Sequence, residues 1–461
     1  MSETLWILSE ERPKINAIKF VLEKFCKVQD LPYRDTQIRI NPLGDENGNF
    51  TFWYEVEGFS SPNVEKVVLR IISGSSSFID FLVFFQKDQP VAGDRPLFMV
   101  EETKTDDEES RNTGVYQRCS KFVYAEQHYP DVDLSMFYNL QVPQRSSQTE
   151  TNIFGTRCLR TLGVQVEGKI LDEKINKPFS SVEELIKFKA SMRQPPAGNI
   201  PIEISYASNK LTISGKLFKD DGLKHDPNIG ALSLIGATAR KLGWTGPIVI
   251  TKHGLEQKHV LPNNKFVRIA NSIGLQLENI ELPKSEIIKP YWNYNSTGEK
   301  LGTILVHLVV ENFSKGFSIF ENHAGSEKGY FIDQSGTPVT LAKYVPESVP
   351  RKSIDIPDLI LLDKNRKQII NLEGKTYENM LLGIKTLENY DDIEELYIEK
   401  YYPGYEITRS VVIFGSHEKE IGHNEVSFLL NEDGEMIVSE NASELIKESF
   451  LNLRRYWQEQ L

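Results

Sequence analysis

The sequence has few cysteines, no long apolar run and no excess of basic residues. Its three cysteines, Cys26, Cys119 and Cys158, are scattered without metal-ligand spacing, which argues against a structural zinc site and favours a reduced, intracellular protein. No apolar stretch approaches the length of a membrane span, and the polar N-terminal segment 1–14 lacks the apolar core of a signal peptide. We therefore expect a cytoplasmic protein that makes no membrane contact.

The acidic charge balance limits the possible partners. The chain carries 65 Asp and Glu against 53 Lys and Arg, a net charge of −12, so it lacks the basic surface that indiscriminate nucleic-acid binding requires. A specific DNA enzyme is still possible, because the local field matters more than the sum and metal-binding carboxylates add to the acidic count. With 461 residues, the chain is long enough for about two or three domains with their own cores.

The most informative stretch is 356–375, IPDLILLDKNRKQIINLEGK. Two short apolar runs flank a charged turn, a pattern that predicts an antiparallel hairpin. Pairing of the two strands brings Asp358, at the start of the first, beside Glu373 and Lys375, at the end of the second. The carboxylates suit Mg²⁺, which prefers hard oxygen ligands, and the lysine can orient or deprotonate water for attack on phosphorus.

A second stretch repeats this arrangement. Runs 77–86 and 96–104 predict another hairpin, with Asp80 near the start of one strand and Glu102-Thr103-Lys104 at the end of the next. Ile79 stands where the first stretch has proline. A bare Glu-x-Lys carries little information, since Glu167-Gly168-Lys169 also fits it without a hairpin aspartate. The alternative for either acid–lysine pair is a solvated strand end.

The elements expected after each hairpin are the same. Segments 115–127 and 377–387 have helical spacing, and strands are expected at 134–142 and 409–414. A helix over 301–313 precedes the second hairpin. Glu311 on this helix is a candidate extra acid, with a solvated helix end as the alternative.

The middle of the chain contains neither pattern. A buried helix is expected over 229–242, and a locally basic run follows its end. The candidate DNA-reading side chains are Arg240, Lys241, Lys252, His253 and Lys258. Such side chains can bind guanine edges or phosphates. A solvated basic face without a partner is the alternative, and His253 and His259 have no third ligand spaced for zinc.

Pro357-Asp358, the hairpin and Glu373-Gly374-Lys375 together resemble the PD-(D/E)xK nuclease superfamily. The N-terminal hairpin is similar to its EcoRI-like branch, and the C-terminal one, with the later run 411–417, to its FokI-like branch. The resemblance implies an α/β fold with two restriction-endonuclease-like mixed-sheet units joined by a mixed α/β region. The expected domains are a nuclease unit at 1–153, a DNA-recognition region at 154–290 and a second nuclease unit at 291–461.

The resemblance also implies a function, a type II restriction endonuclease that cuts double-stranded DNA at an asymmetric site. Each centre would cut one strand, with Mg²⁺ held by Asp80 and Glu102 or by Asp358 and Glu373, and with Lys104 or Lys375 positioning water. A prokaryotic cytoplasm and a companion DNA methyltransferase are then expected. The alternatives are a DNA repair nuclease, a strand-nicking subunit that works with a second nuclease subunit, and a DNA-binding subunit with inactive centres.

Overall fold

The chain divides into two units, neither of which is continuous in sequence. The computed structural model describes residues 3–74, 78–103, 114–140, 149–168, 176–192, 202–218, 226–286, 290–294, 298–323, 330–415 and 422–460. Unit 1 comprises Met1–Ser73, Phe85–Gln89 and Tyr294–Leu461, and unit 2 comprises Gly74–Phe84 and Pro90–Asn293. This division differs from the three consecutive domains expected from the sequence, because the N-terminal segment packs with the C-terminal one. Short strands β5 (Ser73–Gly74) and β14 (Trp292–Asn293) lie where the chain passes from one unit to the other.

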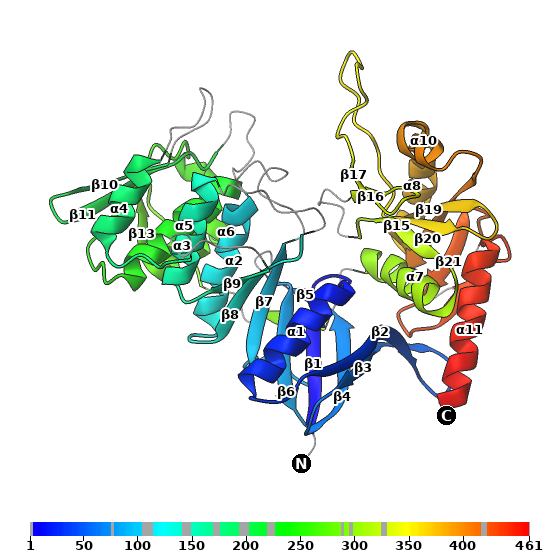
Figure 1. The fold of residues 1–461 in the computed structure, drawn as a ribbon. Coiled ribbons are helices and arrows are strands. Elements are labelled where there is room, and N and C mark those ends of the chain that lie inside the picture. Colours follow the sequence, from blue (N-terminus) through cyan, green and yellow to red (C-terminus); the bar gives the residue numbers. More distant parts are fainter. Residues whose placement is uncertain are drawn as a thin grey trace. The chain divides into compact units, whose positions relative to one another are not determined.

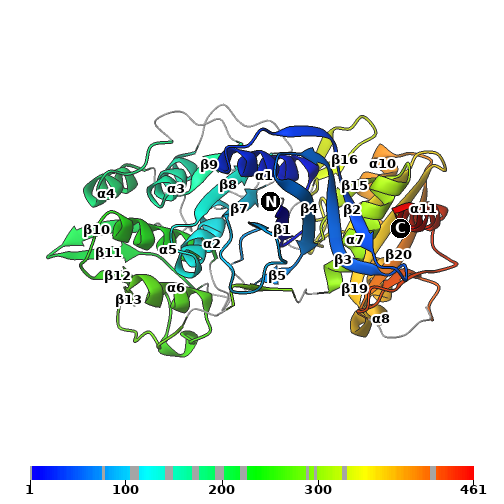
Figure 2. The same ribbon diagram turned by 90° about the horizontal axis from the view of Figure 1, so that it is seen from below.

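The first part of unit 1 is a set of four strands covered by one helix. The strands lie in the order β2-β3-β4-β1, with β1 parallel to β4 and the other pairs antiparallel; they are β1 (Glu3–Ser9), β2 (Arg34–Gly44), β3 (Phe50–Ser60) and β4 (Val64–Ile71). Helix α1 (Ile15–Val28) lies along these strands (Figure 2). It buries Ile18, Leu22 and Phe25, which recur at helical spacing and so lie on one face. The sequence did not predict β1, because polar residues at both ends conceal its short apolar centre.

The second part of unit 1 is a six-stranded mixed sheet in the order β15-β18-β19-β20-β21-β22. The strands are β15 (Phe317–Glu321), β18 (Leu359–Asp363), β19 (Gln368–Thr376), β20 (Glu406–Phe414), β21 (Val426–Leu430) and β22 (Met436–Val438). The hairpin β18–β19 is antiparallel, as predicted, whereas β19, β20 and β21 run parallel. Helix α7 (Glu299–Phe313) packs against β19 and β20 (Figure 1). This contact is close because Gly302 lacks a Cβ, which would lie 2.8 Å from Val412 Cγ1.

Five short elements and one long helix, α11, complete the described residues of this part of unit 1. They are β16 (Tyr330–Ile332), β17 (Pro338–Thr340), α8 (Met380–Thr386), α9 (Asp391–Ile393), α10 (Glu399–Tyr401) and α11 (Glu444–Gln460). The single helix expected over 377–387 is broken, with 3₁₀ turns at Tyr377–Asn379 and Leu387–Asn389 on either side of α8. A π-helical stretch, Glu394–Ile398, joins α9 to α10.

In its described residues, unit 2 combines strands β6 to β9, a second small sheet and five helices. Its strands run β6-β7-β8-β9 in one sheet and β10-β11-β12-β13 in the other; they are β6 (Phe81–Gln86), β7 (Phe98–Thr103), β8 (Asp133–Tyr138), β9 (Gln165–Glu167), β10 (Glu203–Ala207), β11 (Lys210–Ser214), β12 (Ile248–Thr251) and β13 (Leu275–Leu277). The last residues of β6 belong to unit 1. The helices are α2 (Gly114–His128), α3 (Glu150–Thr161), α4 (Val182–Ser191), α5 (Asp226–Lys241) and α6 (Lys265–Ile273), with a 3₁₀ turn at Gln257–His259. The strand, strand, helix, strand order expected after Asp80 is therefore present.

The protein is mixed α/β, as the sequence predicted, and both units contain mixed sheets. Among the described residues, no helix combines the length and the apolar character needed to cross a membrane.

Candidate active sites

The hairpin β18–β19 brings Asp358 and Glu373 together. Leu359 pairs with Leu372, and continuing this register by one residue places Asp358 opposite Glu373, with both side chains on one face. The backbone N–H of Gly374 donates to Asp358 Oδ2 at 2.8 Å, which fixes the carboxylate at the strand end. A Cβ at Gly374 would lie 3.0 Å from the carbonyl oxygen of Glu299, so glycine here allows the first turn of α7 to approach the site.

Lys375 completes this cluster, as predicted from the sequence. Its Nζ lies 2.5 Å from Glu373 Oε1 and 3.1 Å from Glu299 Oε1. Burial alone would lower the pKa of Lys375, but its bonds to Glu373 and Glu299 outweigh burial and raise the pKa. The side chain is therefore an ammonium, suited to orienting water or to stabilising negative charge on a phosphate rather than to removing a proton.

The acidic side of the cluster carries more negative charge than Lys375 neutralises. Burial and the neighbouring Glu373 raise the pKa of Asp358 to about 7. Tyr390, fully buried, donates its hydroxyl hydrogen to Glu373 Oε2 and so holds the second carboxylate in place. Asp358, Glu373 and Glu299 set three carboxylates against one ammonium, a formal charge of −2. These residues fit Mg²⁺, because a divalent cation with oxygen ligands would relieve the repulsion that raises the pKa of Asp358.

The extra acid of this site is Glu299, not Glu311. Both residues belong to α7, but Glu299 opens the helix and contacts Lys375, whereas Glu311 lies near its C-terminal end. Glu311 instead contacts Arg12 and accepts a hydrogen bond from Ser318 Oγ at 2.9 Å. The two acids are 12 residues apart, about 3.3 helical turns, so they point in different directions from α7 and do not share a site.

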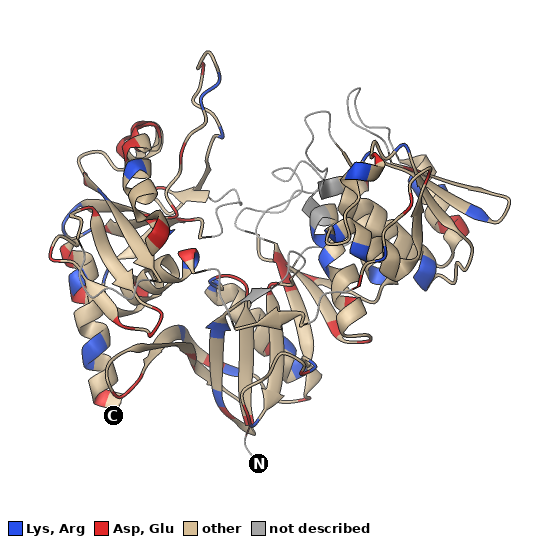
Figure 3. Ribbon diagram, turned by 180° about the vertical axis from the view of Figure 1, so that it is seen from behind, with Lys and Arg blue, Asp and Glu red and all other residues tan. Residues whose placement is uncertain are grey.

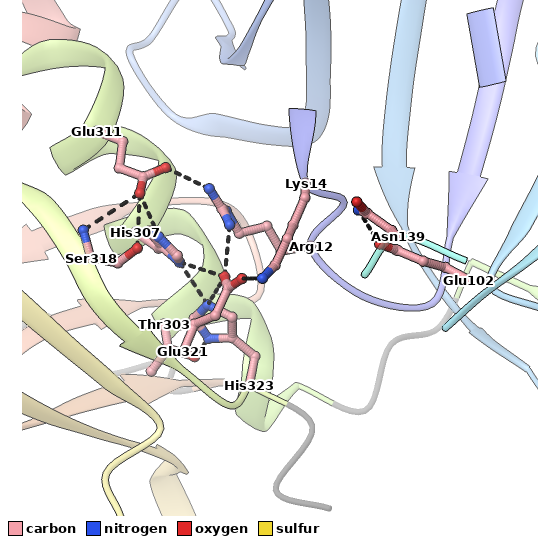
Figure 4. A network of polar contacts seen from close by, with 10 residues as sticks. All are labelled: Arg12, Lys14, Glu102, Asn139, Thr303, His307, Glu311, Ser318, Glu321 and His323. Atoms are coloured by element: carbon pink, nitrogen blue, oxygen red, sulfur yellow. Dashed lines mark hydrogen bonds and ion pairs between the residues drawn. The ribbon is translucent and has the colours of Figure 1, made fainter. Parts of the chain in front are cut away.

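The N-terminal hairpin β6–β7 has a register one residue away from the predicted one. Phe81 pairs with Val100, so the residue opposite Asp80 is Glu101 rather than Glu102. The backbone N–H of Glu102 donates to Asp80 Oδ2 at 2.6 Å, while its side chain accepts a bond from Asn139 Nδ2 at 2.7 Å (Figure 4). The structure thus joins Asp80 to Glu101 and gives Glu102 a different partner. Lys104 lies outside the described residues.

Lys121 occupies the N-terminal cluster from helix α2. Its Nζ lies 3.1 Å from Asp80 Oδ1 and 3.0 Å from Glu101 Oε2, and Arg118 Nε lies 3.7 Å from Glu101 Oε1. Burial would raise the pKa of Asp80, but Lys121, a backbone N–H and Arg118 outweigh burial and lower it. Burial and the charge of Asp80 raise the pKa of Glu101 well above its ordinary value. Lysine and two carboxylates therefore meet in unit 2 too, with the lysine supplied by a helix.

The candidate DNA-binding residues divide into two kinds. Arg240 donates to the carbonyl oxygens of Ile273, Trp244, Gly246 and Gly274 at 2.7–3.0 Å, and buried His253 bonds Glu278 O and Leu255 N. Both side chains thus hold loops of unit 2 in place, and their binding to DNA stays a prediction. The remaining three, Lys241, Lys252 and Lys258, are exposed. Lys252 Nζ lies 4.0 Å from Glu203 Oε2, and Lys258 Nζ lies 2.8 Å from Glu256 Oε2. Lys and Arg of unit 2 are spread over several of its elements (Figure 3).

Replacing Arg240 should therefore destabilise unit 2. We expect Arg240→Met to lower the free energy of unfolding by about 2–3 kcal/mol, because four carbonyl oxygens lose a charged donor. Urea denaturation would measure the change, with Lys241→Met, an exposed neighbour, as the matched control. An Arg240→Met protein as stable as the control would show that the carbonyls find other donors.

Four residues of these clusters were not predicted from sequence: Glu101, Lys121, Glu299 and Tyr390. The parity of the strands could have indicated Glu101 if the hairpin loop had been short enough to fix the register. The other three come from helices or their flanking turns, whose approach to a strand end depends on packing.

Comparison with known proteins does not add to this geometry. No family model matches the sequence, and no curated protein and no solved structure is significantly similar to the chain.

Proposed function

We propose that the chain is an Mg²⁺-dependent DNA endonuclease similar to the PD-(D/E)xK nucleases, and specifically a type II restriction enzyme. The observation that supports this most is the cluster of Asp358, Glu373 and Lys375 at one end of the β18–β19 hairpin. Buried Glu373 and partly buried Asp358, whose pKa is raised, lie beside a lysine that stays charged, an arrangement that costs folding free energy and is useful for phosphodiester hydrolysis.

Each residue of this centre has a part in the proposed reaction. Asp358 and Glu373 would hold Mg²⁺, with Glu299 near enough to add to the field, and the ion would neutralise charge on the phosphate. Lys375 orients the attacking water and stabilises the phosphate oxygens. Gly374 N–H and Tyr390 position the carboxylates, so that little reorganisation is needed when DNA arrives.

Asp80, Glu101 and Lys121 would form the second centre of the same enzyme. Hydrogen bonding between Asp80 and the opposite strand parallels that of Asp358, and the lysine comes from α2 instead of the strand. Two unlike centres in one chain suit an asymmetric DNA site, because such a site has no dyad for a homodimer to match. A companion methyltransferase would then protect the host DNA.

A second candidate function is a nicking subunit that cuts one strand and relies on another protein for the other. The charge of the N-terminal cluster favours it. Asp80 and Glu101 are matched there by Lys121 and Arg118, two acids against two cations, whereas the C-terminal cluster is −2. A divalent ion is therefore bound more weakly in unit 2.

Plasmid digestion over a range of Mg²⁺ concentrations tests both functions. We expect nicked circles at low Mg²⁺ and discrete linear fragments at high Mg²⁺, because the centre with charge −2 fills first. Nicking that never proceeds to linear DNA would favour the nicking subunit, and random cutting would favour a repair nuclease. No cutting under any of these conditions would contradict the nuclease proposal.

The pH dependence of Mg²⁺ use should reflect Asp358. Because its pKa is about 7, protons compete with the metal below that pH, and the Mg²⁺ concentration for half-maximal nicking should rise about tenfold per pH unit. The folded-state pKa is raised, so in chelator Asp358 favours the folded state most at acid pH, and this contribution is lost as pH rises through about 7. Mg²⁺ titrations and urea denaturation in chelator, between about pH 6 and about pH 8, measure both effects. A pH-independent Mg²⁺ requirement would contradict the assignment of Asp358 as a metal ligand.

A further inference from the structure

Three nitrogen and oxygen donors converge beside α7, in unit 1 (Figure 4). They are His307 Nδ1 from α7, Glu321 Oε2 from the end of β15, and His323 Nε2 two residues later. The separations are 2.9 Å between the two ring nitrogens, 3.4 Å from His307 to Glu321, and 4.0 Å from His323 to Glu321. A triangle with these sides has a circumscribed radius of about 2.0 Å, which equals a Zn–N or Zn–O bond length.

The outer nitrogen of each histidine is held by a partner. His307 Nε2 lies 3.0 Å from Glu311 Oε1, and His323 Nδ1 lies 2.9 Å from Thr303 Oγ1. The Glu311 carboxylate also pairs with Arg12 and accepts a hydrogen bond from Ser318 Oγ, and it is placed to accept the N–H of His307. Thr303 Oγ1 donates its own hydrogen to Lys300 O at 3.1 Å, so the same oxygen accepts the N–H of His323. Both inner nitrogens then present lone pairs to the same point, the arrangement of histidines that ligate a metal.

The third ligand is positioned in the same way. Arg12 Nη1 donates to Glu321 Oε2 at 2.7 Å, and Lys14 Nζ lies 3.3 Å from Glu321 Oε1. The side chains of His307 and His323 are 0% and 4% exposed, so the donors are shielded from bulk water. Arg12 and Lys14 orient Glu321 but also oppose a cation by their charge. Affinity must therefore come from the two imidazoles.

We propose that His307, Glu321 and His323 form a binding site for a divalent transition metal ion, with Zn²⁺ as the preferred ion. Two imidazoles and one carboxylate suit Zn²⁺, whereas Mg²⁺ requires oxygen ligands throughout. The site uses none of the residues assigned to the nuclease centres and stands whether or not the chain cuts DNA. A bound ion would link α7 to the end of β15. The sequence argued against structural zinc on the basis of cysteine spacing, and it did not show that His307 and His323 meet.

Metal titration of the full chain tests this site. Protein stripped with chelator is titrated with Co²⁺, and then with Zn²⁺, in excess Mg²⁺. We expect one equivalent of Co²⁺ to give the visible absorption of a tetrahedral site, Zn²⁺ to displace it, and Zn²⁺ to raise the unfolding temperature. His323→Ala and, separately, Glu321→Gln should weaken Co²⁺ binding by about a hundredfold. His423→Ala, in the same unit, should bind like wild type, and so should Asp358→Asn.

The positive charge of Lys14, which opposes a bound cation, allows a test in which a substitution should increase metal affinity. Lys14→Ala removes a cation next to Glu321 and should tighten Co²⁺ binding by about threefold or more. The competing arrangement is a metal-free relay in which Thr303 donates to His323, His323 donates to His307, and His307 donates to Glu311. Absence of saturable Co²⁺ absorption, or Co²⁺ binding that survives His323→Ala but not Asp358→Asn, would overturn the proposal.

Discussion

Asp358→Asn should lower the rate of cutting of one DNA strand by about a thousandfold or more, while the protein remains folded. The substitution removes a negative charge that Mg²⁺ needs and keeps an oxygen that can accept from the N–H of Gly374. Because burial and Glu373 raise the pKa of Asp358, the neutral amide should also be tolerated in the metal-free protein better than the ionised acid. The measurement is plasmid digestion at saturating Mg²⁺, with the nicked strand identified by sequencing.

Asp433→Asn, at an exposed aspartate of the same unit, is the matched control and should leave both cuts unchanged. Denaturation curves of the two variants separate loss of chemistry from loss of structure. An Asp358→Asn enzyme that still linearises plasmid would remove the C-terminal centre from the proposed function. Loss of both cuts together would instead contradict the model of one centre per strand.

The difference between the two hairpins explains what the sequence could and could not predict. In β18–β19 the turn after Asp363 is short, so turn length and apolar pattern fix the register, and Asp358 meets Glu373 as expected. In β6–β7 the connection from Lys87 to Leu97 is long and does not fix it. A shift of one residue there exchanges Glu102 for Glu101 on the face of Asp80.

The other differences arise from tertiary packing. Helical periodicity correctly predicted which segment becomes α7, yet it could not tell which end of the helix meets Lys375, so it indicated Glu311 and missed Glu299. Likewise, basic residue types predict a charged surface but not its partner. Arg240 proved to bind four backbone carbonyls within its own unit, a role that depends on how α5, β13 and their loops fold together.

Lys121→Met should abolish cutting of the strand that Asp358→Asn leaves intact. Lys121 bridges Asp80 and Glu101, so its loss removes the only ammonium that the described residues place on both carboxylates. We expect a decrease of about a thousandfold in the cutting of that strand and a lower stability of unit 2, because buried Glu101 and partly buried Asp80 lose the cation that they share. Lys121→Arg should keep the fold, which allows the chemical effect to be measured by itself.

Lys104→Met is the decisive comparison for this prediction. The sequence pattern assigns the catalytic lysine to position 104, whereas the register of β6–β7 and the position of Lys121 favour the helix. In this register Thr103 corresponds to Lys375, because Thr103 follows Glu101 by two residues as Lys375 follows Glu373. Thr103→Lys in the Lys121→Met background should therefore restore part of the cutting. Strand-resolved cleavage that is lost in Lys104→Met and kept in Lys121→Met would return the role to Lys104.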